Sequence, residues 1–164
     1  MSAEKRYWDS TVIIAYLNNE QQRADICQAI LDEAAAGNIV IYISALSMAE
    51  ALKYRSRKPI AKENRQKVVE FFQNDYIRII NVDRFIARDA QELYWENGID
   101  PKDAIIVATA LKNKFTVMET YDDALITKSK TVGSPPLEIR YPTKVQMGLP
   151  LLYEDQKETE ETEI

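Results

Sequence analysis

Residues 6–17 read RYWDSTVIIAYL, and this stretch decides how the fold begins, because an aspartate separates a short aromatic run from an apolar helical pattern. Tyr7 and Trp8 are typical of a β-strand, whereas the apolar residues of VIIAYL recur at the spacing of a buried helix face. Asp9 therefore lies where a strand changes into a helix. There it is either a helix N-cap, which accepts hydrogen bonds from backbone N–H groups, or a ligand at the carboxyl edge of a parallel sheet.

The rest of the chain alternates apolar runs with helical patterns. Strands are predicted for the runs IVIYIS, YIRIINV, FTVM and LEIRY, at residues 39–44, 76–82, 115–118 and 137–141. Helices are predicted at residues 21–38, ending at Gly37, and at residues 61–75 and 83–98. This alternation predicts an α/β fold with three layers, α/β/α, around a central, mostly parallel sheet. Ligands of such folds bind beyond the carboxyl ends of the strands.

Composition limits the chemistry that the chain can perform. It has 164 residues, 46% of them hydrophobic, as expected for one globular domain. The absence of histidine excludes catalytic triads, histidine bases and histidine-ligated zinc. Cys27 is the only cysteine, so the chain forms no internal disulfide and no cysteine-rich zinc site. Without an apolar segment typical of a signal peptide or membrane span, we expect a soluble, cytoplasmic protein whose chemistry is carried by carboxylates.

The net charge of −5 is concentrated at the C-terminus. Residues 154–164 hold six of the 26 acidic residues and one of the 21 basic residues, which leaves 20 of each in the body. We therefore expect residues 1–153 to form one domain and residues 154–164 to form a disordered acidic tail. Within the domain, the proline- and glycine-containing segment 133–153 predicts a final edge strand followed by an irregular extension, at about 131–153.

Glu50 is the second acidic residue that follows a predicted strand. It belongs to a short helical pattern, ISALSMAEAL, whose apolar stripe includes Ala49 and Leu52. This spacing predicts that Glu50 lies at the edge of the buried helix face. The alternative is a surface glutamate that pairs with Lys53 at i+3.

Asp103 lies in the first turn of a predicted helix. In the sequence GIDPKDAIIVATALKNK, Asp100 suits the N-cap, Pro101 suits N1 and Asp103 takes N3. One interpretation is that Asp103 only complements the helix dipole. However, apolar residues follow it at i+3, i+4, i+7 and i+8, so its face of the helix is the buried one. A buried carboxylate there needs a partner.

The fourth candidate lies in FTVMETYDDALI, where Asp122 or Asp123 caps a short helical pattern after a strand. Asp9, Glu50 and Asp122 each follow a strand, and Asp103 starts a helix. Carboxylates brought together in this way repel one another unless a hard cation neutralises them. Magnesium or manganese suits such oxygen ligands.

These four motifs, taken in order, resemble those of the PIN-domain nucleases, and especially the VapC-type toxins of bacterial toxin–antitoxin pairs. The matching stretches are WDSTVIIAYL, ISALSMAEAL, DAIIVATAL and TYDDAL, which span residues 6 to about 126. The resemblance implies that Asp9, Glu50, Asp103 and Asp122 form a catalytic site that binds Mg²⁺ or Mn²⁺, with Ser10 and Thr120 in support. It assigns no role to Asp123, and Leu125 stands where the family often has phenylalanine.

The resemblance also implies an activity and partners. These are endoribonuclease cleavage that leaves a 5′-phosphate and a 3′-hydroxyl, control by a cognate antitoxin, and a homodimer. Two alternatives stay open: a non-catalytic PIN-like module that binds RNA or protein, and a phosphoreceiver domain, which is also a parallel α/β fold with acidic residues around magnesium. Receivers usually carry adjacent acids after the first strand, whereas Ser10 and Thr11 follow Asp9 here.

A basic segment follows the Glu50 motif. Residues 53–67 contain seven basic residues and one acid, Glu63. We predict that RNA contacts come from its first part, with Tyr54 stacking on a base and with phosphate contacts from Lys53, Arg55, Arg57 and Lys58. The alternative is an ordinary solvated helix face.

Overall fold

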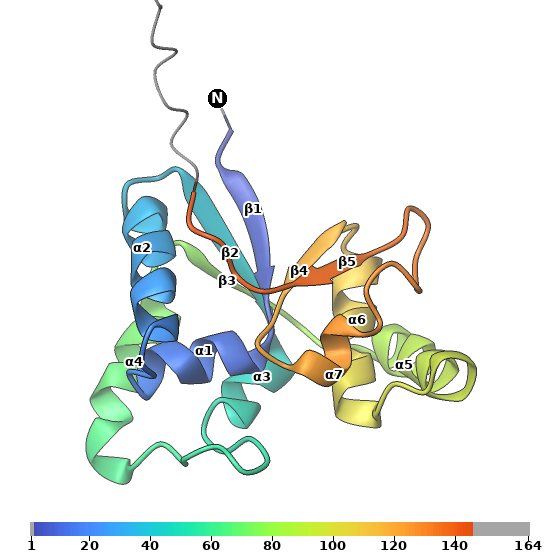
Figure 1. Ribbon diagram of the computed structural model, residues 1–164, viewed down its shortest axis with the longest axis horizontal. Helices are drawn as coiled ribbons and strands as arrows, with labels where there is room; N and C mark the ends of the chain where they lie inside the picture. Colours follow the sequence, from blue (N-terminus) through green and yellow to red (C-terminus); the bar gives the residue numbers. More distant parts are fainter. Residues whose placement is uncertain (1, 146–164) are drawn as a thin grey trace, which may run out of the picture.

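A five-stranded sheet forms the centre of the protein in the computed structural model, which describes residues 2–145 (Figure 1). The spatial order is β3-β2-β1-β4-β5, and every pair of neighbours is parallel. The strands are β1 (Glu4–Trp8), β2 (Ile39–Ser44), β3 (Ile77–Ile80), β4 (Val117–Glu119) and β5 (Glu138–Arg140). The predicted acidic tail, and the predicted extension beyond residue 145, lie outside the described residues.

Helices cover both faces of the sheet, which confirms the three-layer α/β/α prediction (Figure 1). One face is covered by α1 (Ser10–Leu17), α2 (Arg23–Ala35) and α4 (Arg65–Gln73). The other face is covered by α5 (Arg84–Asn97) and α6 (Pro101–Lys112). Shorter elements are α3 (Ala45–Glu50), the 3-10 turn η1 (Lys62–Asn64) and α7 (Asp123–Ile126).

Strand periodicity explains how two adjacent aromatic residues serve two cores. Trp8 packs into the core beneath α1 and α2, and Tyr7 packs into the core beneath α5 and α6. Both are fully buried, because successive side chains of a strand point to opposite faces. The central strand therefore joins the two halves of the molecule.

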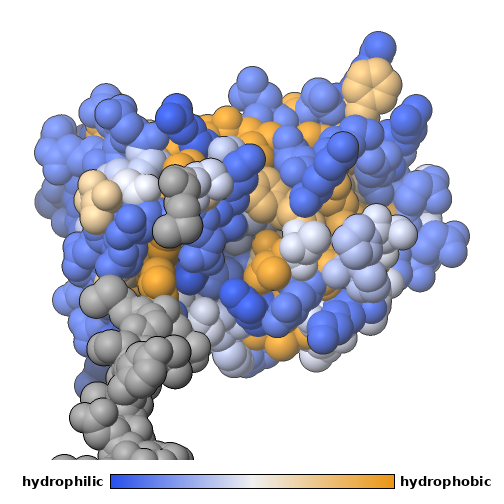
Figure 2. All heavy atoms as spheres, turned by 90° about the horizontal axis from the view of Figure 1, so that it is seen from above, coloured by the Kyte–Doolittle hydropathy of each residue, from blue (hydrophilic) through white to orange (hydrophobic). Residues whose placement is uncertain are grey.

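Polar residues cover most of the side of the molecule at which the N-terminus lies, with apolar side chains visible between them (Figure 2). Within residues 2–145, no helix has the length and apolar character needed to cross a membrane.

The helices follow the sequence predictions closely, with one correction. The first of them ends at Ala35 and is followed by Gly37 in a left-handed conformation, with φ of 85°. The helix that contains Glu50 is shorter than predicted, because it ends at Glu50 itself. Ala49, within this helix, and Leu52, beyond it, are both exposed, so the predicted apolar stripe is wrong.

A buried ion pair ties β1 to β4, which pair as strands only at Trp8 and Glu119. The Arg6 guanidinium lies 3.2 Å from the Glu119 carboxylate, and Trp8 Nε1 donates to the same group over 3.2 Å. The segment after β5 joins this network, because Thr143 N donates to Glu119 over 3.1 Å. Side chains thus reinforce the connection between β1 and β4, whose backbones pair at only one position.

This network predicts a large effect of removing its cation. Arg6→Met should lower the free energy of unfolding by about 3 kcal/mol or more, because it leaves the Glu119 carboxylate buried without a counter-charge. Urea unfolding would measure this, with Lys5→Met on the same strand as an exposed control that stays within about 0.5 kcal/mol of the parent. The double variant Arg6→Met/Glu119→Gln should regain part of the loss. Equal loss in single and double variants would contradict the ion-pair explanation.

Candidate active site

Four carboxylates from four segments lie buried at the carboxyl edge of the sheet. Asp9 follows β1, Glu50 ends α3, Asp103 lies in the first turn of α6, and Asp122 follows β4 and precedes α7. Their exposed fractions are 0%, 8%, 5% and 7%. Acidic residues are rarely buried to this extent without partners, so the contacts of each carboxylate decide what the site can do.

Asp9 uses only one of its carboxylate oxygens in hydrogen bonds. Oδ2 accepts from the hydroxyls of Thr120, over 2.7 Å, and Thr11, over 2.8 Å, and from the Thr11 backbone N–H over 3.5 Å. Oδ1 is buried and has no hydrogen-bond partner. The N-cap interpretation of Asp9 is therefore confirmed, because Oδ2 caps α1, while Oδ1 stays available to a ligand.

Two threonines connect the chain segments around Asp9. The Thr120 hydroxyl accepts from Asp122 N over 2.9 Å, and the Thr11 hydroxyl accepts from Tyr121 N over 2.8 Å. The start of α1 and the turn after β4 are therefore held together by the side chains that orient Asp9. Sequence reasoning did not assign this role to Thr11, although its place two residues after Asp9 was a signal.

Glu50 is oriented by serines. The Ser10 hydroxyl lies 3.0 Å from Glu50 Oε1 and 3.1 Å from the Ser47 hydroxyl. Lys53 does not pair with Glu50, because its ammonium group donates to the backbone carbonyl of Arg55 instead. The surface-pair alternative for Glu50 is therefore wrong, and the carboxylate faces the interior.

Asp103 and Asp122 share two partners from the loop after α3. Arg55 Nη2 lies 2.8 Å from Asp103 Oδ2, and its Nη1 lies 3.2 Å from Asp122 Oδ2. The Tyr54 hydroxyl donates to Asp122 Oδ2 over 2.7 Å and lies 3.4 Å from Asp103 Oδ1. Asp122 also caps α7 with Oδ1, which accepts from Ala124 N over 3.0 Å.

The residues around Asp103 bear out its predicted place in the helix. Pro101 takes N1 and Asp103 takes N3, while Asp100 precedes the helix without a side-chain capping hydrogen bond. Asp100 Oδ2 instead lies 3.7 Å from Arg55 Nη2.

Electrostatics at the site are dominated by burial and by repulsion among the acids. Burial raises the pKa of the Asp9 and Glu50 carboxyls above their usual values. The pKa of Asp103 is raised from 3.8 to about 7, first by burial and then by the charge of Asp9, with Arg55 opposing the rise. Negative charge at this edge is therefore only partly compensated by the protein itself.

The predicted RNA-contact residues lie in different environments. Lys53, Arg55 and Lys58 are exposed, whereas Arg57 forms an ion pair with Glu20. All four lie in a segment without regular helix, so the alternative of a solvated helix face is wrong for them. Tyr54 is 6% exposed and packs in the core beneath α1, so the prediction that it stacks on a base is also wrong.

The residues fit a divalent cation in chemistry, although their oxygens are not gathered around one point. Among residues 2–145, no group of three acidic side chains is arranged closely enough to hold an ion as it stands. The buried, unpartnered Asp9 Oδ1 is the kind of oxygen that a hard cation binds. Arg55 and Tyr54 occupy the facing oxygens of Asp103 and Asp122.

Comparison with protein families gives a match over most of the chain. The sequence profile described as "PIN domain" matches residues 6–130, a range that contains all four acidic motifs. This match decides against the phosphoreceiver alternative. A comparison with curated proteins found no match.

Solved structures with a similar fold include three toxin systems. The Rickettsia felis VapBC2 structure, bound to a DNA fragment from its promoter, gives a TM-score of 0.56 at 17% identity, covering 83% of this chain and 96% of that chain. Mycobacterium tuberculosis VapC20, a sarcin-ricin loop cleaving toxin, gives a TM-score of 0.57 at 15% identity, covering 71% of this chain and 88% of that chain. A toxin–antitoxin complex from Klebsiella pneumoniae gives a TM-score of 0.57 at 20% identity, covering 85% of this chain and 99% of that chain.

The raised pKa of Asp103 predicts how stability depends on pH in EDTA. Between about pH 4 and 7 the folded protein binds more protons than the unfolded chain, so this group stabilises the fold at low pH and loses that contribution as the pH rises through about 7. Asp103→Asn should therefore gain about 1 kcal/mol, roughly 2–4 °C in Tm, at pH 8 and little at pH 4. Thermal melts at both pH values would test this. A variant less stable than the parent at pH 8 would show that the Arg55 ion pair outweighs the repulsion.

Proposed function

Because the chain belongs to the PIN domain family, we propose that it is a metal-dependent endoribonuclease, the toxin of a toxin–antitoxin pair. The catalytic groups are Asp9, Glu50, Asp103 and Asp122, which would hold Mg²⁺ or Mn²⁺. Ser10 and Thr120 are positioning residues. The likeness in fold to three toxin structures supports this assignment.

The observation that carries the proposal is the unpartnered oxygen of Asp9. A carboxylate that is fully buried loses the solvation of its free oxygen, and no protein donor replaces it. A purely structural N-cap needs only the other oxygen. The unused oxygen, together with three further buried acids, favours a site that is completed by a cation.

Each residue contributes to hydrolysis through its position. Thr11 and Thr120 fix Asp9 Oδ2, so that Oδ1 keeps one direction, and Ser10 does the same for Glu50. A bound divalent cation supplies the positive charge that phosphodiester hydrolysis requires at the attacking water and the phosphate oxygens. Asp103, whose pKa is raised to about 7, is partly protonated at neutral pH, and it would bind a cation in its deprotonated form.

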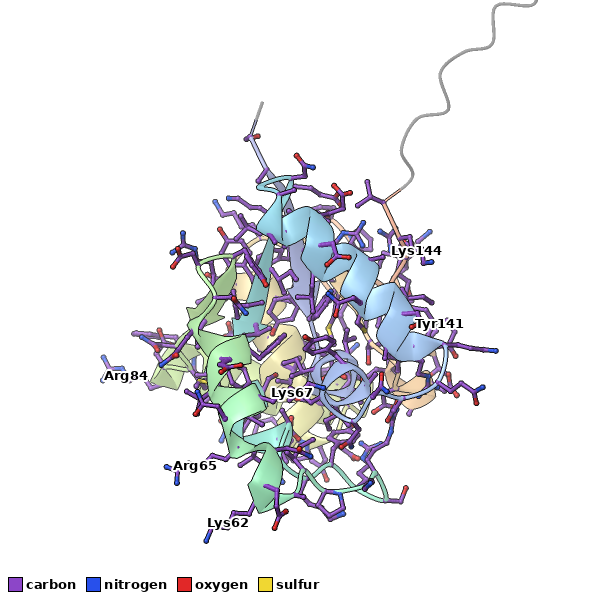
Figure 3. The ribbon with its side chains drawn as sticks, turned by 90° about the vertical axis from the view of Figure 1, so that its left-hand side faces the viewer. Lys62, Arg65, Lys67, Arg84, Tyr141 and Lys144 are labelled. Atoms are coloured by element: carbon purple, nitrogen blue, oxygen red, sulfur yellow. The ribbon has the colours of Figure 1, made fainter. Side chains whose placement is uncertain are left out.

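RNA is held by basic residues that border the acids. Lys53 and Arg55 line the same pocket as Glu50 and Asp103, with a volume of about 430 Å³. Arg57 and Lys58 continue the segment, and the next basic residues are on η1 and α4. Lys62 and Arg65 project into the solvent, whereas Lys67 points toward α1 and donates to the Leu17 carbonyl over 3.2 Å (Figure 3).

The partners of the proposed toxin are a cognate antitoxin and a second copy of the chain. Two of the similar structures are toxin–antitoxin systems, which supports an antitoxin for this chain. The homodimer rests on family resemblance.

The first test of this function is metal-dependent cleavage. Purified protein should cleave structured RNA in Mg²⁺ or Mn²⁺ and stop in EDTA. Asp9→Asn should lower the rate by about 100-fold or more, since even residues that only orient metal ligands usually contribute 10–100-fold. Gel analysis of the products would measure both effects.

Asp89→Asn is the matched control for this cleavage assay, because it makes the same chemical change at an exposed ion pair between Asp89 of α5 and Lys112 of α6. It should cleave like the parent. Undiminished cleavage in EDTA would overturn the metal mechanism. A folded protein that binds RNA and Mn²⁺ but cuts no RNA would favour the non-catalytic alternative.

A second test concerns the RNA-contact residues. Lys53→Ala/Lys58→Ala should weaken RNA binding and lower the slope of log affinity against log salt by about 1.4, because two fewer phosphate contacts release fewer counterions. The control is Lys112→Ala/Lys114→Ala, which removes the same charge at the C-terminal end of α6, the end away from Asp103. Fluorescence anisotropy at several salt concentrations in EDTA would measure both. Equal slopes in the two double variants would place the RNA surface elsewhere.

A further inference from the structure

Arg55 is a solvent-accessible cation that covers two buried carboxylates. Its side chain is 48% exposed, whereas the side chains of Asp103 and Asp122 are 6% and 5% exposed. The guanidinium reaches both with its two terminal nitrogens, over 2.8 and 3.2 Å. A planar guanidinium is well suited to bridge two carboxylates in this way. Arg55 thus supplies the positive charge that Asp103 and Asp122 otherwise lack.

Tyr54 supports the contact between Arg55 and the two carboxylates. The Arg55 guanidinium lies 5.0 Å from the centre of the Tyr54 ring, and the Tyr54 hydroxyl donates to Asp122 Oδ2 over 2.7 Å. Because Tyr54 is buried in the core, its ring provides a fixed surface against which the guanidinium rests. The oxygen Asp122 Oδ2 consequently has both loop residues as partners.

The loop that carries Arg55 is anchored at points away from the acids. Ile60 N donates to Leu52 O over 2.9 Å, Asn18 Nδ2 donates to Lys58 O over 2.7 Å, and Arg57 pairs with Glu20. These bonds hold the loop without using the Arg55 side chain. Arg55 itself has a φ of 46°, a left-handed conformation that is unfavourable for a residue with a side chain. The side chain can therefore leave the carboxylates while the rest of the loop stays in place.

A divalent cation and Arg55 compete for the same oxygens. Asp103 Oδ2 and Asp122 Oδ2 both accept from the guanidinium, and two cations on the same oxygens repel each other. A divalent ion offers twice the charge to a cluster of four acids. An exposed guanidinium, by contrast, loses little when it moves into water or onto another anion. Charge and accessibility both favour replacement of Arg55.

We propose that Arg55 is an exchangeable cation of the acidic site, which neutralises Asp103 and Asp122 in the metal-free protein and moves to an RNA phosphate when a divalent ion replaces it. This inference rests on the proposed function, because it takes the carboxylates as cation ligands. It makes Arg55 a substrate-binding residue that links metal binding to RNA binding. By thermodynamic linkage, RNA that engages Arg55 strengthens the binding of the metal, and the metal strengthens the binding of RNA.

The decisive measurement is the affinity for Mn²⁺ without RNA, followed by the electron paramagnetic resonance signal of the free ion. Arg55→Gln should bind Mn²⁺ about tenfold more tightly than the parent, because no guanidinium has to be displaced. Arg55→Lys keeps the charge and should bind nearly as weakly as the parent. Arg65→Gln makes the same change on α4, at an exposed side chain that projects into the solvent (Figure 3), and should match the parent within about twofold.

The outcomes separate the exchange from the metal site itself. If the parent binds Mn²⁺ and Arg55→Gln binds it no better, the exchange is overturned and the proposed metal site stands. If no variant binds Mn²⁺, both are overturned. Binding by Arg55→Gln alone would support the exchange in its strongest form.

The transfer to RNA is tested by kinetics at saturating Mn²⁺. Arg55→Gln should raise the KM for RNA about tenfold with little change in kcat, because the residue holds a phosphate away from the reacting bond. An unchanged KM would overturn the transfer to RNA.

Discussion

Repulsion among four buried carboxylates is the constraint on which the rest of this structure depends. Asp9, Glu50, Asp103 and Asp122 come from separate segments, yet the parallel sheet brings all four to one edge. Asp9 and Asp122 meet there because the carboxyl ends of the parallel strands β1 and β4 lie on the same side, and the helices α3 and α6 add Glu50 and Asp103. Such an edge is unfavourable in isolation: burial raises the carboxyl pKa of Asp9, Glu50 and Asp103, and the charge of Asp9 raises it further at Glu50 and Asp103. The neighbouring side chains reduce this cost: the hydroxyls of Ser10, Thr11, Thr120 and Tyr54 contact the carboxylates, and Arg55 supplies a positive charge.

The hydrogen bonds that orient the acids also hold the fold together. Thr11 and Thr120 each bond Asp9 and a backbone N–H of the turn after β4, so the same contacts fix a carboxylate and join two chain segments. This joint matters because β1 and β4 pair as strands at only one position. A substitution at either threonine therefore affects both the orientation of Asp9 and the connection between the start of α1 and the turn after β4.

The positive charge near the site is divided between two tasks. Arg55 compensates buried acids, and Arg57 pairs with Glu20 and holds the loop. Lys53 and Lys58 remain exposed and suit contacts with a polyanion. In the proposed function, the basic side chains concentrated in the segment that follows Glu50 let the acidic site accept RNA although the body of the chain carries no net charge.

The sequence alone predicted the alternation of strands and helices, the starts of the helices and the acidic residues that follow the strands. It could do so because periodicity, caps and turns depend on residues that are close along the chain. The α/β/α fold and the four candidate acids followed from these local patterns together with a family resemblance. The tertiary structure alone decided that α3 ends at Glu50 and that Asp9 keeps one oxygen free. It also decided that Tyr54 is buried against Asp122 and that Arg55 pairs with Asp103 and Asp122. Those features depend on distances between residues that are 40 to 111 positions apart, such as Ser10 and Glu50 or Asp9 and Thr120, and no local pattern encodes such distances.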